Sequence, residues 1–547
     1  MSRTDSPVAV RPRPKTAVGF WNVYFLAKFA LVWAGYLRFH ALGNIALLAL
    51  LLVPLKPGIL NRARCLAALV AGTVLVWHES WLPGWASVVE NARALLGFSA
   101  NYVLELIWGF IDWPMVGAFV VLSVLYLLVR DYVRVTTVTV CLVAYFALTP
   151  LWQNTHAPAL RALPAMGTGV AALEASAFSD TADTSIVEPR QIEEWYRTFL
   201  AYEKDRRAHL PDGINAKDTP FDIVLLNVCS LSTDDLTAAN LTDHRVFKRF
   251  DVRFEHFNSA TSYSGPATLR LLTGACGQPA HNALYGERRP DCELMNRLDA
   301  LSFKQYLFMD HSGEYDDYRH TLRRQAGRTP QLTKGRYPLK YMSFNDERIA
   351  DTRAVLRHWL STVKAAGSKR TVTLMNFIAL HDGNRLPRHS RAEPFAPRAK
   401  AFLDALNGFM NALEKSGRKT MLVLVPEHGA AVRGDTTQTA RLRDIPSPAI
   451  TEVPTMVKFF GVKRKDAAPV TVAGSTSYLA LAELIGRAVE KNAFADGSAP
   501  LDVRELARDL PQTHRVAENA QAKVLHFKGA DFVKLHRADW EPYGAAR

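Results

Sequence analysis

The chain has 547 residues, enough for two or three domains, and its average composition hides two unlike parts. Its net charge of +14 invites a nucleic-acid interpretation, but no run of Lys and Arg with interleaved aromatic residues occurs, so we expect no nucleic-acid partner. Roughly the first 155 residues are apolar with sparse charge, and the rest resembles an ordinary globular domain in composition.

The apolar part contains stretches that could cross a membrane as helices. A hydrocarbon core about 30 Å thick needs about 20 helical residues, and shorter stretches suffice when flanking residues reach the interface. After a tail at 1–16, we expect a transmembrane domain of five helices over 17–152, with a lipid bilayer as its partner. The five stretches lie at about 17–36, 40–55, 65–82, 113–129 and 135–152.

Charged residues inside the apolar part have specific interpretations. Residues 86–112 mix Leu, Ile and Trp with Glu90, Arg93 and Glu105, which predicts an amphipathic helix at the membrane interface rather than a sixth span. Lys28 falls near the middle of the first span, where a buried charge is costly. It could mark a site inside the helix bundle, but we favour a lysine that snorkels or pairs with a neighbour such as Glu105.

Basic residues in the short loops predict the orientation. One side of the predicted membrane domain carries nine of them and the other side only Arg38 and Arg93, which places the N-terminus in the cytoplasm. Five spans then put the chain after residue 155 outside. The first span lacks a small-residue cleavage site, so we interpret it as an anchor and not a signal peptide. The nine residues are Arg3, Arg11, Arg13, Lys15, Lys56, Arg62, Arg64, Arg130 and Arg134.

The exported part begins with a linker. Residues 153–190 are rich in Ala, Thr, Ser and Pro and lead into a helix near 188–205, so we expect a catalytic domain over 191–547. Short β-rich runs then alternate with amphipathic helical patterns, which predicts a mainly parallel sheet with helices on both faces. The runs are 222–228, 305–309, 371–379, 421–425 and 455–460, and the helical patterns include 345–364 and 397–413.

Several of these predicted strands end in groups that bind metals. In open parallel sheets the active site lies at the carboxyl ends of the strands, and thiol, carboxylate and imidazole groups are zinc ligands. Taken alone, a strand-end cysteine is usually a buried apolar thiol, and an acid–imidazole pair is often a solvated loop. Their convergence favours a metal site. The groups are Cys229, Glu427 with His428, His381 with Asp382, and Asp310 with His311, of which we leave Asp310 and His311 out of the core site.

A hydroxyl group opens the helical stretch that follows Cys229. Ser264 stands in SATSYSGPATLRLLTG, with Pro266 two residues later, a pattern typical of a helix start. Ser264 could be merely an N-cap. That role is compatible with a catalytic one, because a helix N-terminus also favours a phosphate group.

The order of these motifs resembles that of the alkaline phosphatase superfamily. A hydrophobic strand ends in a ligand, a hydroxyl follows about 35 residues later, and a strand followed by an acid, His and Gly lies far downstream. Lipid A phosphoethanolamine transferases have an acidic first ligand, a Thr nucleophile and Asp-His-Gly. With Cys229, Ser264 and Glu427-His428-Gly429 after a five-span membrane part, the chain resembles instead the cellulose phosphoethanolamine transferases of bacterial cellulose synthase systems.

This resemblance implies a fold of the alkaline phosphatase type and one Zn²⁺ bound by Cys229, Glu427 and His428. It implies that Ser264 takes phosphoethanolamine from phosphatidylethanolamine and passes it to cellulose. It also implies a bacterial inner membrane, a periplasmic catalytic domain and other cellulose synthase subunits as partners. A zinc-bound hydroxyl ionises near neutral pH, so the chemistry is consistent with these residues.

Three supporting residues also come from the resemblance. His381 matches the first histidine of an H-x-x-G-S-H stretch in the lipid A enzymes, although this chain has HDGNRLPRH. Arg443 stands where those enzymes have a further histidine, which disfavours a second metal and supplies a positive charge for phosphate. Tyr263 adjoins the nucleophile. His381 and Arg443 could instead be surface residues, and Tyr263 could simply pack.

The five cysteines divide by region. Cys65 and Cys141 lie in apolar spans, where a thiol behaves as a small hydrophobe. Cys276 and Cys292 are 16 residues apart in the exported part, where a disulfide is the default. Zinc binding by that pair is the alternative, but it would leave the Glu427-His428 pair without a purpose.

Three other classes of function compete: a hydrolase of the same fold, a transferase with another acceptor or donor, and a non-enzymatic factor. A sulfatase would need Cys or Ser in C/S-x-P-x-R, and Thr268 stands in place of that Arg. A two-metal phosphatase would need more Asp and His ligands than the motifs supply. A transferase that uses another envelope glycan, lipid A or a phosphoglycerol donor would have the same fold and mechanism. A non-enzymatic assembly factor would not need the intact Cys, Ser, Glu and His set.

Overall fold

In the computed structural model, the chain folds into two compact units. Unit 1 comprises residues 1–86, 109–164 and 546–547, and unit 2 comprises residues 87–108 and 165–545. The tail at 1–16, most of the linker at 153–190 and most of the first half of 86–112 lie outside the described residues. These are 18–34, 37, 39–56, 58–80, 97–109, 113–155, 187–215, 217–327, 330–367, 369–435, 437–495, 499–536 and 538–544.

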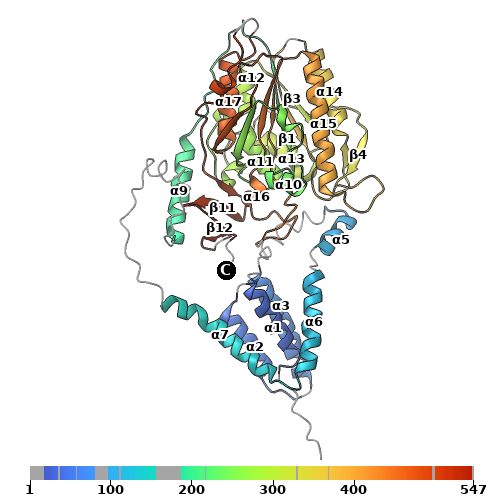
Figure 1. Ribbon diagram of the computed structural model, residues 1–547, viewed down its shortest axis with the longest axis vertical. Coiled ribbons are helices and arrows are strands. Elements are labelled where there is room, and N and C mark those ends of the chain that lie inside the picture. Colours follow the sequence, from blue (N-terminus) through green and yellow to red (C-terminus); the bar gives the residue numbers. More distant parts are fainter. Residues whose placement is uncertain are drawn as a thin grey trace, which may run out of the picture. The chain divides into compact units, whose positions relative to one another are not determined.

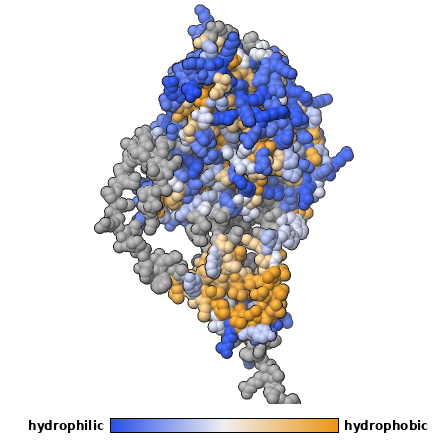
Figure 2. All heavy atoms as spheres, viewed as in Figure 1, coloured by the Kyte–Doolittle hydropathy of each residue, from blue (hydrophilic) through white to orange (hydrophobic). Residues whose placement is uncertain are grey.

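Unit 1 is built from apolar helices (Figure 1). Of the described helices, only α3 is long and apolar enough to cross a membrane by length and composition, whereas α2, α6 and Val135–Leu148 of α7 are shorter. The five-span topology therefore stays a prediction. Figure 2 shows hydrophobic residues gathered on the visible outside of this unit. The helices are α1 (Trp21–Trp33), α2 (Ala41–Leu52), α3 (Ile59–Glu79), α6 (Trp113–Val129) and α7 (Val135–Thr155).

Lys28 pairs with a neighbouring carboxylate, as we expected, but the partner is Glu79 and not Glu105. It is buried and lies 2.6 Å from Glu79, at the end of α3, and 2.6 Å from Asn44 of α2. Asn44 donates in turn to Glu79 at 2.5 Å. Glu79 is the last residue of α3 and Lys28 lies within α1, so their pairing depends on how the helices pack. Pairing and hydrogen bonding compensate the cost of burying these charges.

Unit 2 has a seven-stranded sheet in the order β3-β6-β1-β7-β8-β2-β9. It is mostly parallel, as predicted, but β8 runs antiparallel to both of its neighbours, β7 and β2. Sequence reasoning identified β1, β3, β6, β7 and β8, and it missed β2 and β9. The strands are β1 (Asp222–Val228), β2 (Val252–Phe257), β3 (Lys304–Met309), β6 (Thr371–Phe377), β7 (Thr420–Leu424), β8 (Met456–Phe460) and β9 (Val470–Thr476).

The central strand β1 is buried on both faces, which is why its sequence DIVLLNV is almost continuously apolar. Ile223 and Leu225 pack into one hydrophobic core, and Val224 and Leu226 pack into the other. Helices α11, α12 and α17 contribute to the first core, and α10, α14 and α15 to the second. Their bounds are α10 (Thr233–Ala238), α11 (Ser264–Leu272), α12 (Leu294–Ala300), α14 (Thr352–Ala365), α15 (Phe395–Ser416) and α17 (Tyr478–Glu490).

The predicted helix at 345–364 begins later than expected. Residues Arg348–Ala350 form β5, which pairs with β4 (Leu339–Met342), and α14 starts only at Thr352. Asp351 explains that start, because its side chain accepts a hydrogen bond from the Ala354 backbone N–H as an N-cap. The remaining helices are α5 (Ala100–Gly109), α9 (Pro189–Asp205), α13 (Tyr318–Gln325), α16 (Pro448–Thr451) and α18 (Val503–Leu506).

A second, antiparallel sheet in the order β10-β11-β12-β13 lies near the end of the chain, where sequence reasoning placed no strands. Helix α9 packs Ile192, Tyr196 and Phe199 against it in one hydrophobic cluster. The predicted helix at 188–205 is thus part of a small two-layer structure. The strands are β10 (Val516–Glu518), β11 (Ala522–Phe527), β12 (Ala530–Leu535) and β13 (Glu541–Pro542).

Candidate active site

Cys229, Glu427 and His428 lie together at the carboxyl ends of β1 and β7. The two strands are parallel neighbours, so the residues that follow them meet at one edge of the sheet. One ligand atom from each residue lies within 4.8 Å of the others, and the three side chains are at most 1% exposed. Residues nearly 200 positions apart in the sequence thus form one cluster of metal-binding groups.

The ring orientation of His428 suits a metal ligand. Its Nδ1 lies 2.8 Å from the carbonyl oxygen of Gly429, so Nδ1–H donates there and the Nε2 lone pair remains available. Nε2 points toward the Cys229 sulfur at 3.6 Å. Burial and the positive charge of Arg443 hold the pKa of His428 well below its usual range. The neutral imidazole that results is the form that binds metals.

The two carboxylate oxygens of Glu427 differ in their hydrogen bonding. Oε1 accepts hydrogen bonds from Asn376 at 2.5 Å and Thr268 at 3.1 Å, whereas the buried Oε2 has no hydrogen-bond partner among the described residues. Burial raises the pKa of both Glu427 and Cys229, for Cys229 to about 12. A buried oxygen without a partner is costly, and a cation would compensate it. With a thiol and an imidazole beside it, this donor set fits zinc.

Ser264 is the first residue of α11, and Tyr263 rather than Ser264 is the N-cap. The Ser264 Oγ lies 3.3 Å from the Cys229 sulfur and 3.3 Å from the Nε2 of His428. Its side chain is partly exposed, so a substrate can reach it. The backbone N–H groups of Ser264 and Gly265 lie at the N-terminus of α11, and a helix N-terminus favours an anion beside it.

Arg443 and His381 border this cluster. The guanidinium of Arg443 lies 3.4 Å from the Nδ1 of His428 and 3.5 Å from the Nε2 of His381. His381 donates from Nδ1 to the carbonyl oxygen of Asp382 at 2.7 Å. Burial and the charge of Arg443 lower the pKa of His381 to about 3, so its imidazole is neutral and Arg443 is the fixed positive charge.

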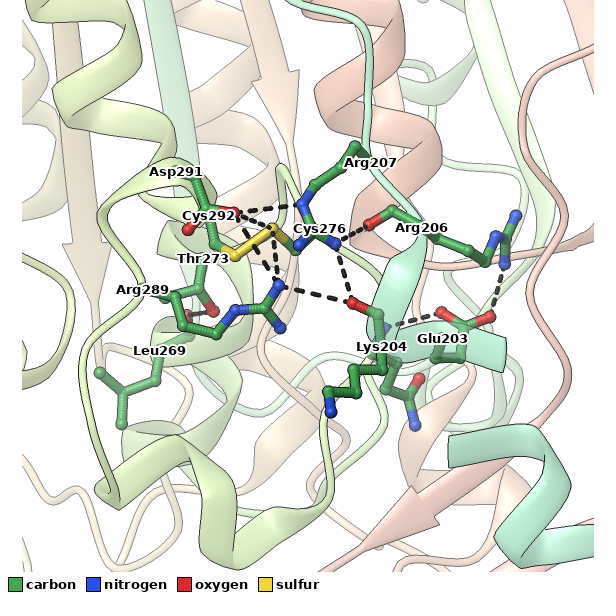
Figure 3. The surroundings of a disulfide bond; sticks show 11 residues. Glu203, Lys204, Arg206, Arg207, Leu269, Thr273, Cys276, Arg289, Asp291 and Cys292 are labelled. Atoms are coloured by element: carbon green, nitrogen blue, oxygen red, sulfur yellow. Dashed lines mark hydrogen bonds and ion pairs between the residues drawn. A yellow bond between two sulfur atoms is a disulfide. The ribbon is translucent and has the colours of Figure 1, made fainter. Parts of the chain in front are cut away.

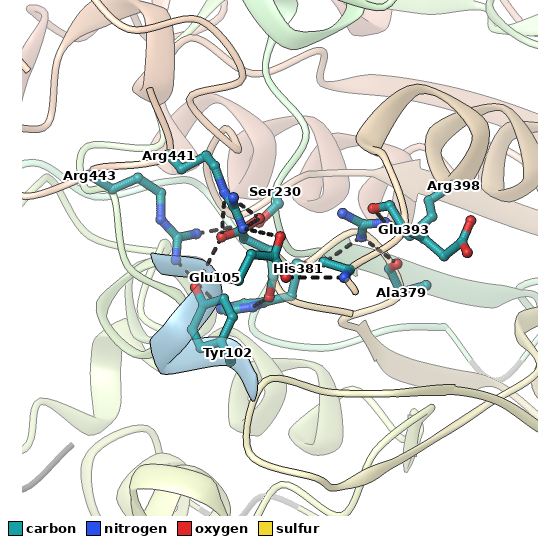
Figure 4. Close-up of polar contacts among 11 residues, drawn as sticks. Tyr102, Glu105, Ser230, Ala379, His381, Glu393, Arg398, Arg441 and Arg443 are labelled. Atoms are coloured by element: carbon teal, nitrogen blue, oxygen red, sulfur yellow. Dashed lines mark hydrogen bonds and ion pairs between the residues drawn. The ribbon is translucent and has the colours of Figure 1, made fainter. Parts of the chain in front are cut away.

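Helix α5 contributes contacts that sequence reasoning missed (Figure 4). Tyr102 donates a hydrogen bond to Asp382 at 3.0 Å, and Glu105 forms an ion pair with Arg441 at 3.3 Å. Arg441 also pairs with Asp382 at 2.9 Å. The predicted interfacial segment therefore packs beside His381 within unit 2. No local signal could have predicted this, because Tyr102 and Asp382 are 280 residues apart.

Two buried amides behind the cluster could have been predicted. Asn227 and Asn376 are amide residues in the mostly apolar strands β1 and β6, and they are paired in the sheet register. Asn376 donates to the side-chain oxygen of Asn227 at 2.9 Å as well as to Glu427. An amide inside an apolar strand has to find a partner, so these two residues were recognisable as part of a polar network.

The backbone around Cys229 and His428 has two unusual features. Ser230 has a φ of +67°, a conformation that non-glycine residues rarely adopt and that occurs most often at functional sites. Gly429 cannot be replaced without displacing atoms, because a Cβ there would lie 2.6 Å from the Ser232 hydroxyl and 2.9 Å from the Asp235 carboxylate. Asp235 in turn accepts from the backbone N–H of Val432 at 3.1 Å, which secures the loop after His428.

Asp310 and His311 are not among the clustered groups. Asp310 is buried and accepts from the backbone N–H of Ile378 at 3.0 Å, and burial raises its pKa to about 8. His311 lies 2.8 Å from the side-chain oxygen of Asn376. His311 therefore contacts the network behind Glu427, one residue removed from the cluster itself.

Cys276 and Cys292 form a disulfide with an S–S distance of 2.06 Å (Figure 3). Asp291 lies beside it and pairs with Arg207 at 3.1 Å. Because both sulfurs are consumed in the bond, this pair does not offer thiolates to a metal. Of the three remaining cysteines, Cys229 is the buried one.

Comparisons with known proteins identify relatives of this chain. Residues 21–148 match the N-terminal domain model of the cellulose biosynthesis protein BcsG, and residues 176–540 match its C-terminal domain model. The chain is 40% identical to the cellulose biosynthesis protein BcsG of Salmonella typhimurium and 38% identical to that of Escherichia coli, in each case over 96% of both chains.

Solved structures show more distant similarity. A protein in the alkaline phosphatase superfamily from Vibrio parahaemolyticus matches with a TM-score of 0.44 and 12% identity, over 63% of this chain and 83% of that chain. The lipooligosaccharide phosphoethanolamine transferase A of Neisseria meningitidis, an integral membrane protein, matches with a TM-score of 0.38 and 12% identity. That match covers 88% of this chain and 97% of the other.

Proposed function

Because the chain belongs to the BcsG family of cellulose biosynthesis proteins, we propose that it transfers phosphoethanolamine from phosphatidylethanolamine to hydroxyl groups of nascent cellulose. The family supports cellulose as the acceptor. The observation that carries the enzymatic part is the position of the Ser264 hydroxyl, which lies 3.3 Å from both a thiol and an imidazole of a buried cluster. A hydroxyl held beside metal-binding groups at a helix N-terminus is arranged to attack phosphorus.

Cys229, Glu427 and His428 would hold one Zn²⁺ ion. The partnerless oxygen of Glu427 and the free Nε2 of His428 support this assignment. When bound, zinc would lower the pKa of the Ser264 hydroxyl and make it nucleophilic near neutral pH. Asn376 and Thr268 would orient the carboxylate of Glu427, and Gly429 would hold the imidazole in the required tautomer.

In the donor step, the Ser264 hydroxyl loses its proton as its Oγ forms a bond to phosphorus, and the bond from phosphorus to the diacylglycerol oxygen breaks. The diacylglycerol oxygen takes up a proton and leaves, and phosphoethanolamine remains on Ser264. Negative charge develops on the phosphoryl oxygens. Arg443 and the N-terminus of α11 would stabilise that charge.

In the acceptor step, a sugar hydroxyl loses its proton as its oxygen bonds to phosphorus, and the bond from phosphorus to the Ser264 Oγ breaks. Ser264 regains a proton. The neutral His381, with its Nε2 3.5 Å from the guanidinium of Arg443, would help to orient that guanidinium at the edge of the site. Tyr263 would support the nucleophile through its contact with Asp444.

The membrane-anchored arrangement supports a lipid donor. We propose five spans over 17–152 with the N-terminus in the cytoplasm, a linker over 153–190, and a periplasmic catalytic domain over 191–547 that meets other cellulose synthase subunits. The exposed apolar surface of unit 1 supports insertion in a bacterial inner membrane. An enzyme held at the bilayer surface has direct access to phosphatidylethanolamine.

The test is intact-mass spectrometry of the full-length protein in detergent, after incubation with phosphatidylethanolamine and without an acceptor. We expect a gain of one phosphoethanolamine that maps to Ser264. The Ser264→Ala variant should show no gain but should keep its zinc, since three protein ligands remain. Normal donor turnover in Ser264→Ala would contradict a covalent mechanism.

A hydrolase of the same fold is the second candidate, because water could replace the sugar hydroxyl at the partly exposed Ser264. The same experiment distinguishes the two. A transferase keeps the adduct until a glycan is added, whereas a hydrolase releases free phosphoethanolamine continuously.

A further inference from the structure

Two exposed tyrosines lie beside Ser264. Among the described residues from 187 to 544, Tyr263 and Tyr285 are the large hydrophobic side chains that are left more than a third exposed, at 38% and 39%. All others with such exposure lie in the helices and loops before residue 149. Exposed apolar groups that cluster at one place on a soluble surface usually mark an interaction site.

Both tyrosines flank the first turn of α11. Tyr263 immediately precedes Ser264, and its hydroxyl donates to Asp444 at 2.7 Å. Tyr285 ends the 3₁₀ helix His281–Tyr285, and its hydroxyl oxygen would lie 3.9 Å from a Cβ on Gly265, the residue after Ser264. The nucleophile therefore has one tyrosine on the residue before it and a second tyrosine, from a different segment, near the residue after it.

Each ring is held in place by its neighbours. The ring centroid of Tyr285 lies 5.5 Å from that of His281, and Gln325 donates to the Tyr285 carbonyl at 3.3 Å. The Tyr285 hydroxyl makes no hydrogen bond within the described part of the chain. Tyrosine offers a large, rigid contact surface at a low cost in side-chain entropy, so a fixed and exposed tyrosine pair is suited to binding.

Carboxyl groups accompany the rings. Asp316 and Asp317 are exposed, both with left-handed backbone conformations, and the charge of Asp316 adds to the effect of burial in raising the pKa of Tyr285. Asp444 is on the Tyr263 side. Carboxylates accept hydrogen bonds from hydroxyl groups, and aromatic rings contact the C–H faces of sugar rings.

We propose that Tyr263 and Tyr285 form the binding platform for the sugar acceptor, beside the first turn of α11 that carries the nucleophile. This inference rests on the proposed function and specifies where its acceptor binds. A β-linked glucan chain presents apolar ring faces and equatorial hydroxyl groups, which match two tyrosine rings bordered by carboxylates. Acyl chains of a lipid would require a surface of aliphatic side chains. Among the described residues from 187 to 544, no Leu, Ile or Val is among the exposed large hydrophobic residues.

The test separates the two half-reactions in the full-length protein. The donor step is followed as the rate of mass gain on Ser264, and the acceptor step as the loss of that adduct with increasing cellopentaose. The variants are Tyr285→Ala and Tyr285→Phe. Tyr306→Ala serves as a matched control, because Tyr306 is near the start of β3, away from the carboxyl ends of the strands.

We expect Tyr285→Ala to raise the KM for cellopentaose at least about tenfold more than it changes the rate of the donor step. Tyr285→Phe, which keeps the ring, should stay within about threefold of the wild type. Equal losses in both steps in Tyr285→Ala, or an unchanged KM for cellopentaose, would overturn the proposal. An equal loss in Tyr285→Phe and Tyr285→Ala would also overturn it, because the hydroxyl and not the ring would then be essential.

A second measurement distinguishes this proposal from the proposed function. Binding of cellopentaose to the unloaded protein is measured by saturation-transfer NMR, which needs no catalytic step. If Ser264 never gains mass but Tyr285→Ala abolishes the cellopentaose signal, the platform stands and the proposed mechanism fails. If Ser264 gains mass but cellopentaose gives no signal with the wild type, the platform is wrong and the donor step stands.

Discussion

At the scale of single residues, the candidate site depends on where each side chain finds its hydrogen-bond partner. Glu427 is held through one oxygen by Asn376 and Thr268, which leaves the other oxygen free within the described structure. His428 is held through Nδ1 by Gly429. Because the outer partners orient the inner groups, residues that never touch the substrate should control metal binding.

We predict that Asn376→Ala weakens zinc binding about 10–100-fold, because the Glu427 carboxylate loses its closest donor. Competition with a zinc chelator of known affinity measures the change. Thr373→Ala is the matched control, since Thr373 is also buried in β6 but accepts a hydrogen bond from Trp359, away from the site. Equal zinc affinities in wild type and Asn376→Ala would contradict the role of Asn376.

Asp310 leads to a prediction on pH. Burial raises its pKa from 3.8 to about 8, so the folded state binds this proton more tightly than the unfolded state does. The stability from that proton is complete below about pH 4 and is lost as the pH rises toward 8, by at most about 1.4 kcal/mol per pH unit. Asp310→Asn cannot titrate and should lack this loss.

Urea unfolding of the full chain at pH 5, 6 and 7 measures the effect. The free energy of unfolding of Asp310→Asn minus that of the wild type should increase with pH. A difference that is constant over this range would mean that Asp310 is ionised throughout.

At the scale of elements, helix α5 packs against the segments of unit 2 that border the candidate site. The ring centroids of Tyr102 and Phe344 lie 5.9 Å apart. The ring of Phe344 stacks on that of His381, with their centroids 4.6 Å apart. The position of α5 is therefore connected to the edge of the candidate site by packed rings and by the Glu105–Arg441 ion pair. Packing of this kind is sensitive to single atoms, because protein interiors have few voids.

Gly383 provides a test of this contact. It has a φ of +78°, and a Cβ there would lie 2.6 Å from the Tyr102 ring and 2.8 Å from the Cβ of Phe344. We predict that Gly383→Ala speeds amide hydrogen exchange in α5 at least about fivefold, through backbone strain and displacement of Tyr102.

The matched control is Gly367→Ala. Gly367 has a similar φ of +71° but open space around the added Cβ, so this variant carries the backbone strain without the clash. Faster exchange of α5 in both variants, or in neither, would contradict a specific contact between Gly383 and Tyr102.

At the scale of the whole molecule, the chain joins an apolar helical unit to an α/β unit. Only α3 passes the length and composition test for a membrane helix among the described residues, so orientation needs an experiment. Basic residues in the loop near Lys56 and Arg62 favour a cytoplasmic location for that loop. The catalytic unit should then face the periplasm.

We predict that a cysteine at exposed Arg433 reacts with a membrane-impermeant maleimide in cells with a permeabilised outer membrane, whereas a cysteine at exposed Lys56 reacts only after lysis. Cys65 and Cys141 are first replaced by Ser. Cys229 is buried and the other two cysteines are disulfide-bonded, so the background is low. The reverse labelling pattern would contradict the proposed topology.

The amino-acid sequence alone was sufficient for the parts of this protein that depend on local pattern. A strand that is buried on both faces is mostly apolar, so β1, β6 and β7 were recognisable, and parallel strands bring the residues after them to one edge. That reasoning led to Cys229, Glu427 and His428 as neighbours. The order of these residues with Ser264 also identified the family.

Only the tertiary structure decided the contacts that join distant segments. Periodicity shows which face of a helix is apolar but not which surface it meets, so the pairing of Lys28 with Glu79 and of Glu105 with Arg441 could not be predicted. The antiparallel direction of β8 and the sheet of β10 to β13 were not predicted for the same reason, since a strand's direction and partners are set by packing across the whole unit. The exposure of Tyr285 beside Ser264 likewise depends on how two separate segments fold against each other.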